Sequence, residues 1–96
     1  MEKRNNAYEL ELKEISLKNG DEGTKSLRFN FDNHDDLFHI VEVIRSKQIF
    51  ENKETATEFA LGLKLFTEVM LKNKDNPLFE DLRPAISDFM KKLKSL

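Results

Sequence analysis

An alternation of apolar and polar residues near the amino terminus predicts a β-hairpin over about residues 7–31. The apolar positions of its two segments are Tyr8, Leu10 and Leu12, then Leu27, Phe29 and Phe31. Between them lies Asn19-Gly20, the pair favoured at the centre of a two-residue type I′ turn because both positions need a positive φ angle. Such a turn pairs residues whose numbers sum to 39. The six apolar side chains then lie opposite one another on one face of the sheet.

The end of the hairpin nearest the turn does not follow this pattern. In the same register, Ile15 and Leu17 point to the opposite face. One interpretation is a second apolar face at this end of the hairpin. The other is a β-bulge, near Lys13 and Glu14 or at Gly23, that returns both side chains to the core side. We favour the bulge, because bulges are common in long, twisted hairpins.

Apolar residues spaced three and four apart predict three helices, over about residues 34–47, 54–74 and 77–95. The first helix is expected to begin after Asn33 as its N-cap. Pro84 is expected to break the last one into a short helical turn and a final helix from about residue 82. The predicted fold is therefore α+β, with an antiparallel hairpin packed on three helices in the order β-β-α-α-α. At this length we expect a single domain over residues 1–96.

The second predicted helix is more apolar than a surface helix needs to be. Its inward stripe consists of Ala56, Phe59, Ala60, Leu63, Phe66, Val69 and Met70. Gly62 inside this helix predicts the close approach of another element. Once one core is assigned, the apolar residues left over are Ile15, Leu17, Leu61 and Leu65. We expect these four to form an interface with a second copy or another protein; the alternative is that they are ordinary exposed apolar residues.

Composition and charge exclude several classes of function. The chain is 39% hydrophobic and 35% charged, which is typical of a globular protein. Its 16 basic and 18 acidic residues leave a net charge of −2, and the one lysine cluster, Lys91, Lys92 and Lys94, is typical of the carboxyl end of a helix. We therefore expect no binding to nucleic acid or to a membrane surface. The absence of cysteine excludes disulfides, thiolate metal sites and cysteine nucleophiles. No apolar stretch suggests a signal peptide or a membrane span, so we expect a cytoplasmic protein.

One cluster of side chains could support chemistry, namely His34, Asp35, His39 and Glu42. Imidazole and carboxylate groups within one helical turn are what a metal site or an acid–base pair uses. However, His34 and His39 are five residues apart, whereas paired ligands on a helix lie three or four apart. We favour a solvated polar face with a contact between Asp35 and His39. Neither a nucleophile motif nor a phosphate-binding loop accompanies the cluster, so we expect no enzymatic activity and no cofactor.

Three parts of the chain, residues 31–38, residues 59–73 and residues 76–84 continuing into 89–93, resemble a known family. It is a family of small, single-domain bacterial proteins catalogued only as a domain of unknown function. The resemblance implies a compact bacterial α+β protein, and it assigns no activity, ligand or catalytic residue. The residues themselves favour a non-enzymatic interaction or adaptor module that forms a homodimer. The alternative is a small-molecule or metal-dependent site between His34 and Glu42.

Overall fold

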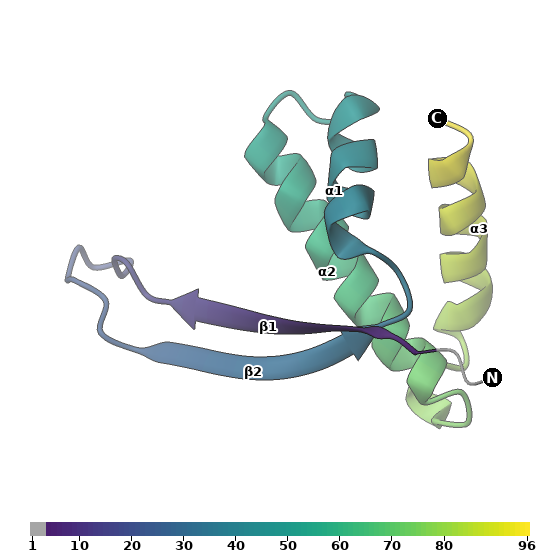
Figure 1. Ribbon diagram of the computed structural model, residues 1–96, viewed down its shortest axis with the longest axis horizontal. Coiled ribbons are helices and arrows are strands. Elements are labelled where there is room, and N and C mark those ends of the chain that lie inside the picture. Colours follow the sequence, from purple (N-terminus) through teal and green to yellow (C-terminus); the bar gives the residue numbers. More distant parts are fainter. Residues whose placement is uncertain (1–3) are drawn as a thin grey trace. The chain divides into compact units, whose positions relative to one another are not determined.

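The computed structural model describes residues 4–96, and its backbone contacts divide the chain into two units. The first unit extends to Asp36 and contains the hairpin, while the second, from Leu37 to Leu96, contains the helices (Figure 1). The hairpin is followed by three helices, with a short 3₁₀ helix before the last, which confirms the predicted α+β class and element order. The prediction of a single domain over 1–96, which includes residues outside the described range, stays a prediction.

The sheet consists of two antiparallel strands, β1 (Asn6–Lys13) and β2 (Ser26–Asn33). The structure confirms the predicted pairs Tyr8 with Phe31, Leu10 with Phe29 and Leu12 with Leu27. The Tyr8 and Phe31 rings stack with their centroids 5.6 Å apart, and the Phe29 ring lies 5.7 Å from that of Phe31. Cross-strand aromatic contacts of this kind stabilise the register.

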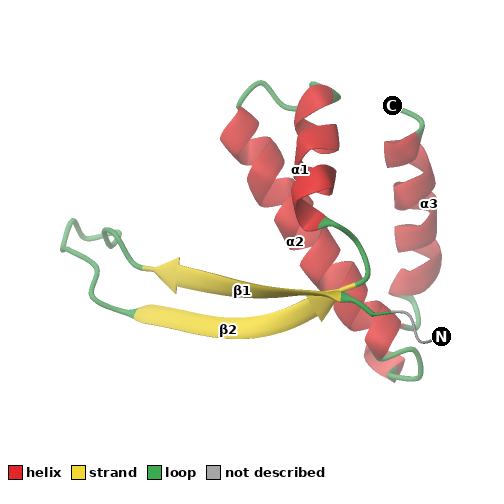
Figure 2. Cartoon of the chain, viewed as in Figure 1, coloured by secondary structure: helices red, strands yellow, loops and turns green. Residues whose placement is uncertain are grey.

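The chain reverses through a three-residue loop, so the predicted two-residue type I′ turn is wrong. A stretch without strand structure separates this loop from β1 and from β2 (Figure 2). The Leu17 N–H donates to the Asp21 carbonyl at 2.8 Å, and the Gly20 N–H donates to the Leu17 carbonyl at 3.0 Å. Gly20 has a φ of 94°, whereas Asn19 has no positive φ. The Asn19 side chain instead accepts a hydrogen bond from the Asp21 N–H at 2.9 Å. One left-handed glycine and this side-chain bond are enough to close a three-residue loop.

A bulge in the second half of the hairpin compensates for the longer loop. The Gly23 N–H donates to the Ile15 carbonyl, a pair whose numbers sum to 38, while the Glu14 N–H donates to the Lys25 carbonyl, a pair that sums to 39. Thr24 is therefore the extra residue, and the Glu14 carboxylate accepts hydrogen bonds from the N–H groups of Thr24 and Lys25. The predicted bulge is present at this end, and it restores the register of the two strands.

The segment between β2 and the first helix differs from the prediction. Asn33 is the last residue of β2, paired with Asn6, and is not a helix N-cap. Its fully buried side chain accepts a hydrogen bond from the Asp35 N–H at 3.0 Å. The Asp35 carbonyl in turn accepts hydrogen bonds from the Tyr8 hydroxyl at 2.9 Å and the Asn6 amide at 3.3 Å. Strand pairing thus continues to Asn33, and helix α1 begins only at Leu37.

Helices α1 (Leu37–Ser46) and α2 (Lys53–Lys72) contribute most of the buried core of the second unit. Ile44 of α1 packs with Ala56 and Ala60 of α2 and with Leu93 near the carboxyl terminus. Helix α1 ends, and α2 begins, within one residue of the predicted positions. The Asn52 side chain caps α2 by accepting a hydrogen bond from the Glu54 N–H at 2.7 Å, which satisfies one of the unpaired donors of the first turn.

The break predicted near Pro84 is confirmed. A short 3₁₀ helix, η1 (Pro77–Phe79), precedes α3 (Leu82–Lys94), so that Pro84 lies in the first turn of α3, where a missing N–H group does no harm. The Asn76 side chain caps η1 by accepting a hydrogen bond from the Leu78 N–H at 3.0 Å. Asp81 precedes α3 but makes no side-chain capping bond.

Gly62 in the interior of α2 does not mark a close contact, so that prediction is wrong. A Cβ added at this position would meet nothing within 4 Å. We therefore expect Gly62→Ala to raise the free energy of unfolding by about 0.5–1 kcal/mol, because alanine restricts the unfolded chain and favours the helix. Urea unfolding followed by circular dichroism measures the change. Gly20→Ala is the matched control: it also has open space, but its φ of 94° should make alanine destabilising.

Candidate protein-interaction surface

One face of the hairpin carries apolar side chains that are open to solvent. We call it the hairpin face, and it consists of Tyr8, Leu10, Leu12, Leu27, Phe29 and Phe31. Leu12, Leu27 and Phe29 are 62%, 56% and 39% exposed, and the other three are half-buried. The alternation places these residues on one face correctly, but the expectation that this face lies in the core is wrong for the three exposed side chains. Contiguous exposed apolar residues are typical of interaction surfaces.

The backbone of the same hairpin is also available for pairing. The sheet contains only two strands within residues 4–96, so each strand has one outer edge of N–H and C=O groups that no strand of the described chain pairs. An isolated two-stranded sheet is only marginally stable in water, and three or more strands with an apolar face are far more stable. An open edge is a template for strand addition by another chain.

The opposite, polar face of the hairpin holds a small charge network. The Arg28 guanidinium forms ion pairs with Glu9, at 2.9 Å from Nε, and with Glu11, at 2.8 Å from Nη2. Lys13 lies 3.8 Å from Glu11. All four side chains are exposed, so each pair contributes little to stability, on the order of 0.2–1 kcal/mol. Sequence analysis missed this network, although the confirmed register places Arg28 directly opposite Glu11.

The four predicted interface residues fall into two groups. Ile15 and Leu17 lie between the strands and the turn and are exposed, Ile15 to 84%, so the bulge does not bury them. Leu61 and Leu65 are half-buried on α2. The exposed apolar side chains of that helix include Phe66 and Val69, which were predicted to face inward. The Phe66 ring contacts Phe79 of η1 edge to face, with centroids 6.0 Å apart, which accounts for part of its position.

The polar cluster predicted on the first helix is arranged differently. His34 and Asp35 precede α1, with His34 Nε2 and Asp35 Oδ2 3.5 Å apart, so the helical spacing that predicted a contact between Asp35 and His39 does not apply. His39 and Glu42 are exposed on α1. Within residues 4–96, no group of three or more histidine, aspartate or glutamate side chains is placed to hold a metal ion.

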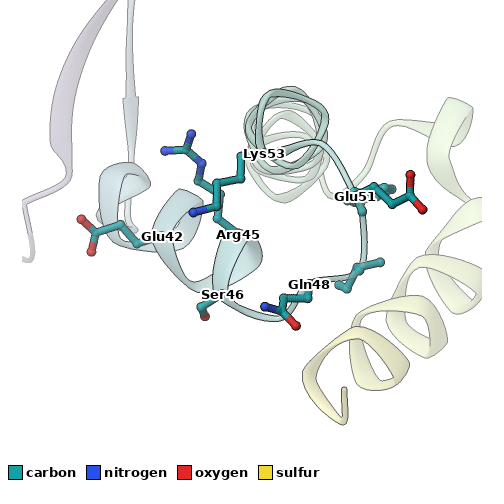
Figure 3. A pocket seen from close by; sticks show the side chains of 8 residues that line it. Glu42, Arg45, Ser46, Gln48, Glu51 and Lys53 are labelled. Atoms are coloured by element: carbon teal, nitrogen blue, oxygen red, sulfur yellow. The ribbon is translucent and has the colours of Figure 1, made fainter.

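A pocket of about 700 Å³ lies where α1 ends and α2 begins (Figure 3). Its lining combines charged, polar and apolar side chains: Glu42, Arg45, Ser46, Gln48, Ile49, Phe50, Glu51 and Lys53. The carboxylates of Glu42 and Glu51 point to opposite sides of the pocket (Figure 3). The two carboxylates therefore do not form the close pair that acid–base catalysis uses.

None of the helices described between residues 4 and 96 has the length and apolar character needed to cross a lipid bilayer.

Comparison with known proteins identifies relatives but no activity. Residues 6–95 match the model of DUF3861, described as a domain of unknown function with a solved structure. The chain is also similar to a protein of unknown function from Pectobacterium atrosepticum SCRI1043, known from a crystal structure. The two share 32% sequence identity with a TM-score of 0.84, and the match covers 97% of this chain and 100% of that one. No curated protein matches the sequence. The resemblance noted in the sequence is thereby confirmed.

Proposed function

The chain belongs to DUF3861, a family of unknown function, and we propose that it is a non-enzymatic protein-interaction module that works as a homodimer in the cytoplasm. The observation that carries the proposal is the hairpin face, where Leu12, Leu27 and Phe29 are open to solvent on a sheet that has two strands within residues 4–96. A bacterial origin belongs to the same proposal, and its support is the resemblance to a bacterial protein.

Burial of apolar surface and added backbone pairing both favour association through the hairpin. Fully burying a leucine or phenylalanine side chain contributes roughly 1.5–3 kcal/mol. Contact between two hairpins covers part of this apolar surface on each copy, which offsets part of the roughly 4–15 kcal/mol that association costs in lost translational and rotational freedom. Added backbone pairing at a strand edge would then make the complex stable.

The dimer is tested by light scattering after size exclusion, across a roughly hundredfold concentration range. We expect twice the mass of one chain at the upper concentrations. Phe29→Glu should shift the protein towards a monomer, because a carboxylate without a partner would replace an apolar ring where the two hairpins meet. Leu78→Glu is the matched control, since Leu78 of η1 is 76% exposed but lies outside the hairpin.

Two results would contradict the proposal. A mass of one chain at every concentration would overturn the homodimer. Equal behaviour of the Phe29 and Leu78 variants would show that the hairpin is not the contact surface.

A further inference from the structure

We infer that two copies of the chain pair through the outer edge of β2, antiparallel to one another, so that the two hairpins form one continuous four-stranded sheet. This inference rests on the homodimer proposed above and specifies its geometry. A closed dimer with two-fold symmetry uses the same surface on both copies, so a strand edge must pair with itself. Antiparallel pairing of β2 with the second copy's β2 meets that condition and gives the strand order β1-β2-β2-β1.

The hydrogen-bond pattern of the hairpin shows which residues face this edge. In an antiparallel pair, positions that exchange hydrogen bonds alternate with positions whose N–H and C=O groups point outward. The bond from the Glu14 N–H to the Lys25 carbonyl, next to the last strand pair, sets this alternation. The outward groups of β2 then belong to Ser26, Arg28, Asn30 and Asp32.

One register of the two β2 strands places opposite charges and aromatic side chains in facing positions. When Asn30 lies opposite Asn30 of the second copy, Arg28 lies opposite Asp32 of the second copy, and this occurs twice because of the symmetry. Phe29 then lies opposite Phe31 of the second copy, in the closely spaced position between hydrogen-bonded pairs. Opposite charges and aromatic pairs in facing positions both stabilise a sheet. The apolar residues of both hairpins remain on one face.

Neighbouring registers are less favourable. With Phe29 at the two-fold axis, Arg28 would face Asn30 and Asp32 would face Ser26, so neither charge would meet its opposite. The outer edge of β1 is worse, because the registers that overlap most of that strand place Glu9 or Glu11 opposite another glutamate. Like charges in facing positions are destabilising. The charges therefore select the β2 edge and the register centred on Asn30.

The Arg28 guanidinium can donate hydrogen bonds to carboxylates of both hairpins at once. Its Nε and one terminal nitrogen bind Glu9 and Glu11 of its own chain. A guanidinium has five N–H donors in a planar fork, so the remaining donors can reach a carboxylate on the other side of β2. In the proposed register that carboxylate is Asp32 of the second copy.

Disulfide trapping tests the register without altering either charge. The chain has no cysteine, so Asn30→Cys introduces a single thiol at the two-fold axis. Facing Cα atoms in a hydrogen-bonded antiparallel pair are about 5.5 Å apart, within the range that a disulfide spans. Under mild oxidation we expect a covalent dimer on a non-reducing gel. Ser26→Cys on the same strand is the control and should stay monomeric on the gel, because its two copies would lie far from the axis.

Charge reversal supplies an independent test. Arg28→Asp gives a chain with only acids at the two facing positions, and Asp32→Arg gives a chain with only bases. Each variant alone should show a dissociation constant raised roughly tenfold or more, because two attractive pairs become two repulsive ones. An equimolar mixture should recover dimer, since every facing pair is then complementary. Lys13→Glu, on β1, is the control and should leave the dissociation constant unchanged.

The outcomes separate this inference from the proposed function. A trapped dimer together with recovery in the mixture supports the β2 edge. A dimer that forms in the unmodified chain but is neither trapped at Asn30 nor changed by charge reversal overturns the edge and register, while the proposed homodimer stands. Weakening of both single variants without recovery in the mixture also overturns the register. A monomeric unmodified chain overturns both.

Discussion

Replacing Ile44 by alanine is expected to lower the free energy of unfolding by about 2–5 kcal/mol. Ile44 is the α1 side chain at the centre of the helical core, where it packs with Ala56 and Ala60 of α2 and with Leu93 of α3. Two of these neighbours are alanines, whose side chains are too short to fill the space that a truncated isoleucine leaves. The loss therefore combines the transfer energy of the missing methyl groups with the energy of an unfilled cavity.

The measurement is urea unfolding of the unmodified chain and of the Ile44→Ala variant at the same protein concentration, followed by circular dichroism. Ile44→Val should lie between them, with a loss of about 0.5–1.5 kcal/mol, because it removes a single methyl group. Leu78→Ala, at a position that is mostly exposed, should change stability by less than about 0.5 kcal/mol. If Ile44→Ala matched Leu78→Ala, Ile44 would not belong to the core.

Gly23→Ala is expected to destabilise the protein by about 1–3 kcal/mol, because there is no room for the added methyl group. A Cβ at Gly23 would approach the Glu14 Cβ and lie 2.5 Å from the Glu14 carbonyl carbon and 2.7 Å from its oxygen. Two of these three atoms belong to the backbone, so relief requires the strands to separate at the bulge. Because Glu14 also accepts hydrogen bonds from Thr24 and Lys25, those bonds should weaken together.

Amide hydrogen exchange measures this effect locally, and we expect faster exchange at Thr24 and Lys25 in the variant. Gly62→Ala is the natural comparison, since the same substitution there meets open space. A stability gain at Gly23 equal to that at Gly62 would show that the bulge does not constrain the hairpin.

The hairpin shows how a local pattern can predict a register correctly despite a wrong turn. The two-residue loop predicted at Asn19 and Gly20 differs from the structure, whereas the favoured bulge is present. The three-residue loop shifts the pairing by one residue, and the extra residue Thr24 shifts it back. The register survives because it is specified by the alternation of apolar side chains along both strands, and a slip of one residue would reverse their faces.

Local sequence predicts some helix starts correctly, and a distant contact decides another. The starts of α2 and η1 follow from Asn52 and Asn76, whose side chains bond to the N–H group two residues later, and this chemistry can be recognised in sequence. The start of α1 was predicted too early. Asn33 resembles an N-cap, but pairing with Asn6, far away in the chain, holds it in the sheet. A contact between distant residues decided that boundary.

The sequence by itself determined the strands, the helices, their order and the side of the hairpin that is apolar, because these depend on propensities and spacings within short segments. Only the tertiary structure decided which apolar residues are covered. Leu10 and Leu12 belong to the same alternation, yet one is half-buried and the other mostly exposed. Likewise, Met70 of α2 is buried while Phe66 of the same predicted stripe is exposed. Burial depends on which helices and strands contact one another, and a pattern within a short segment does not contain that information.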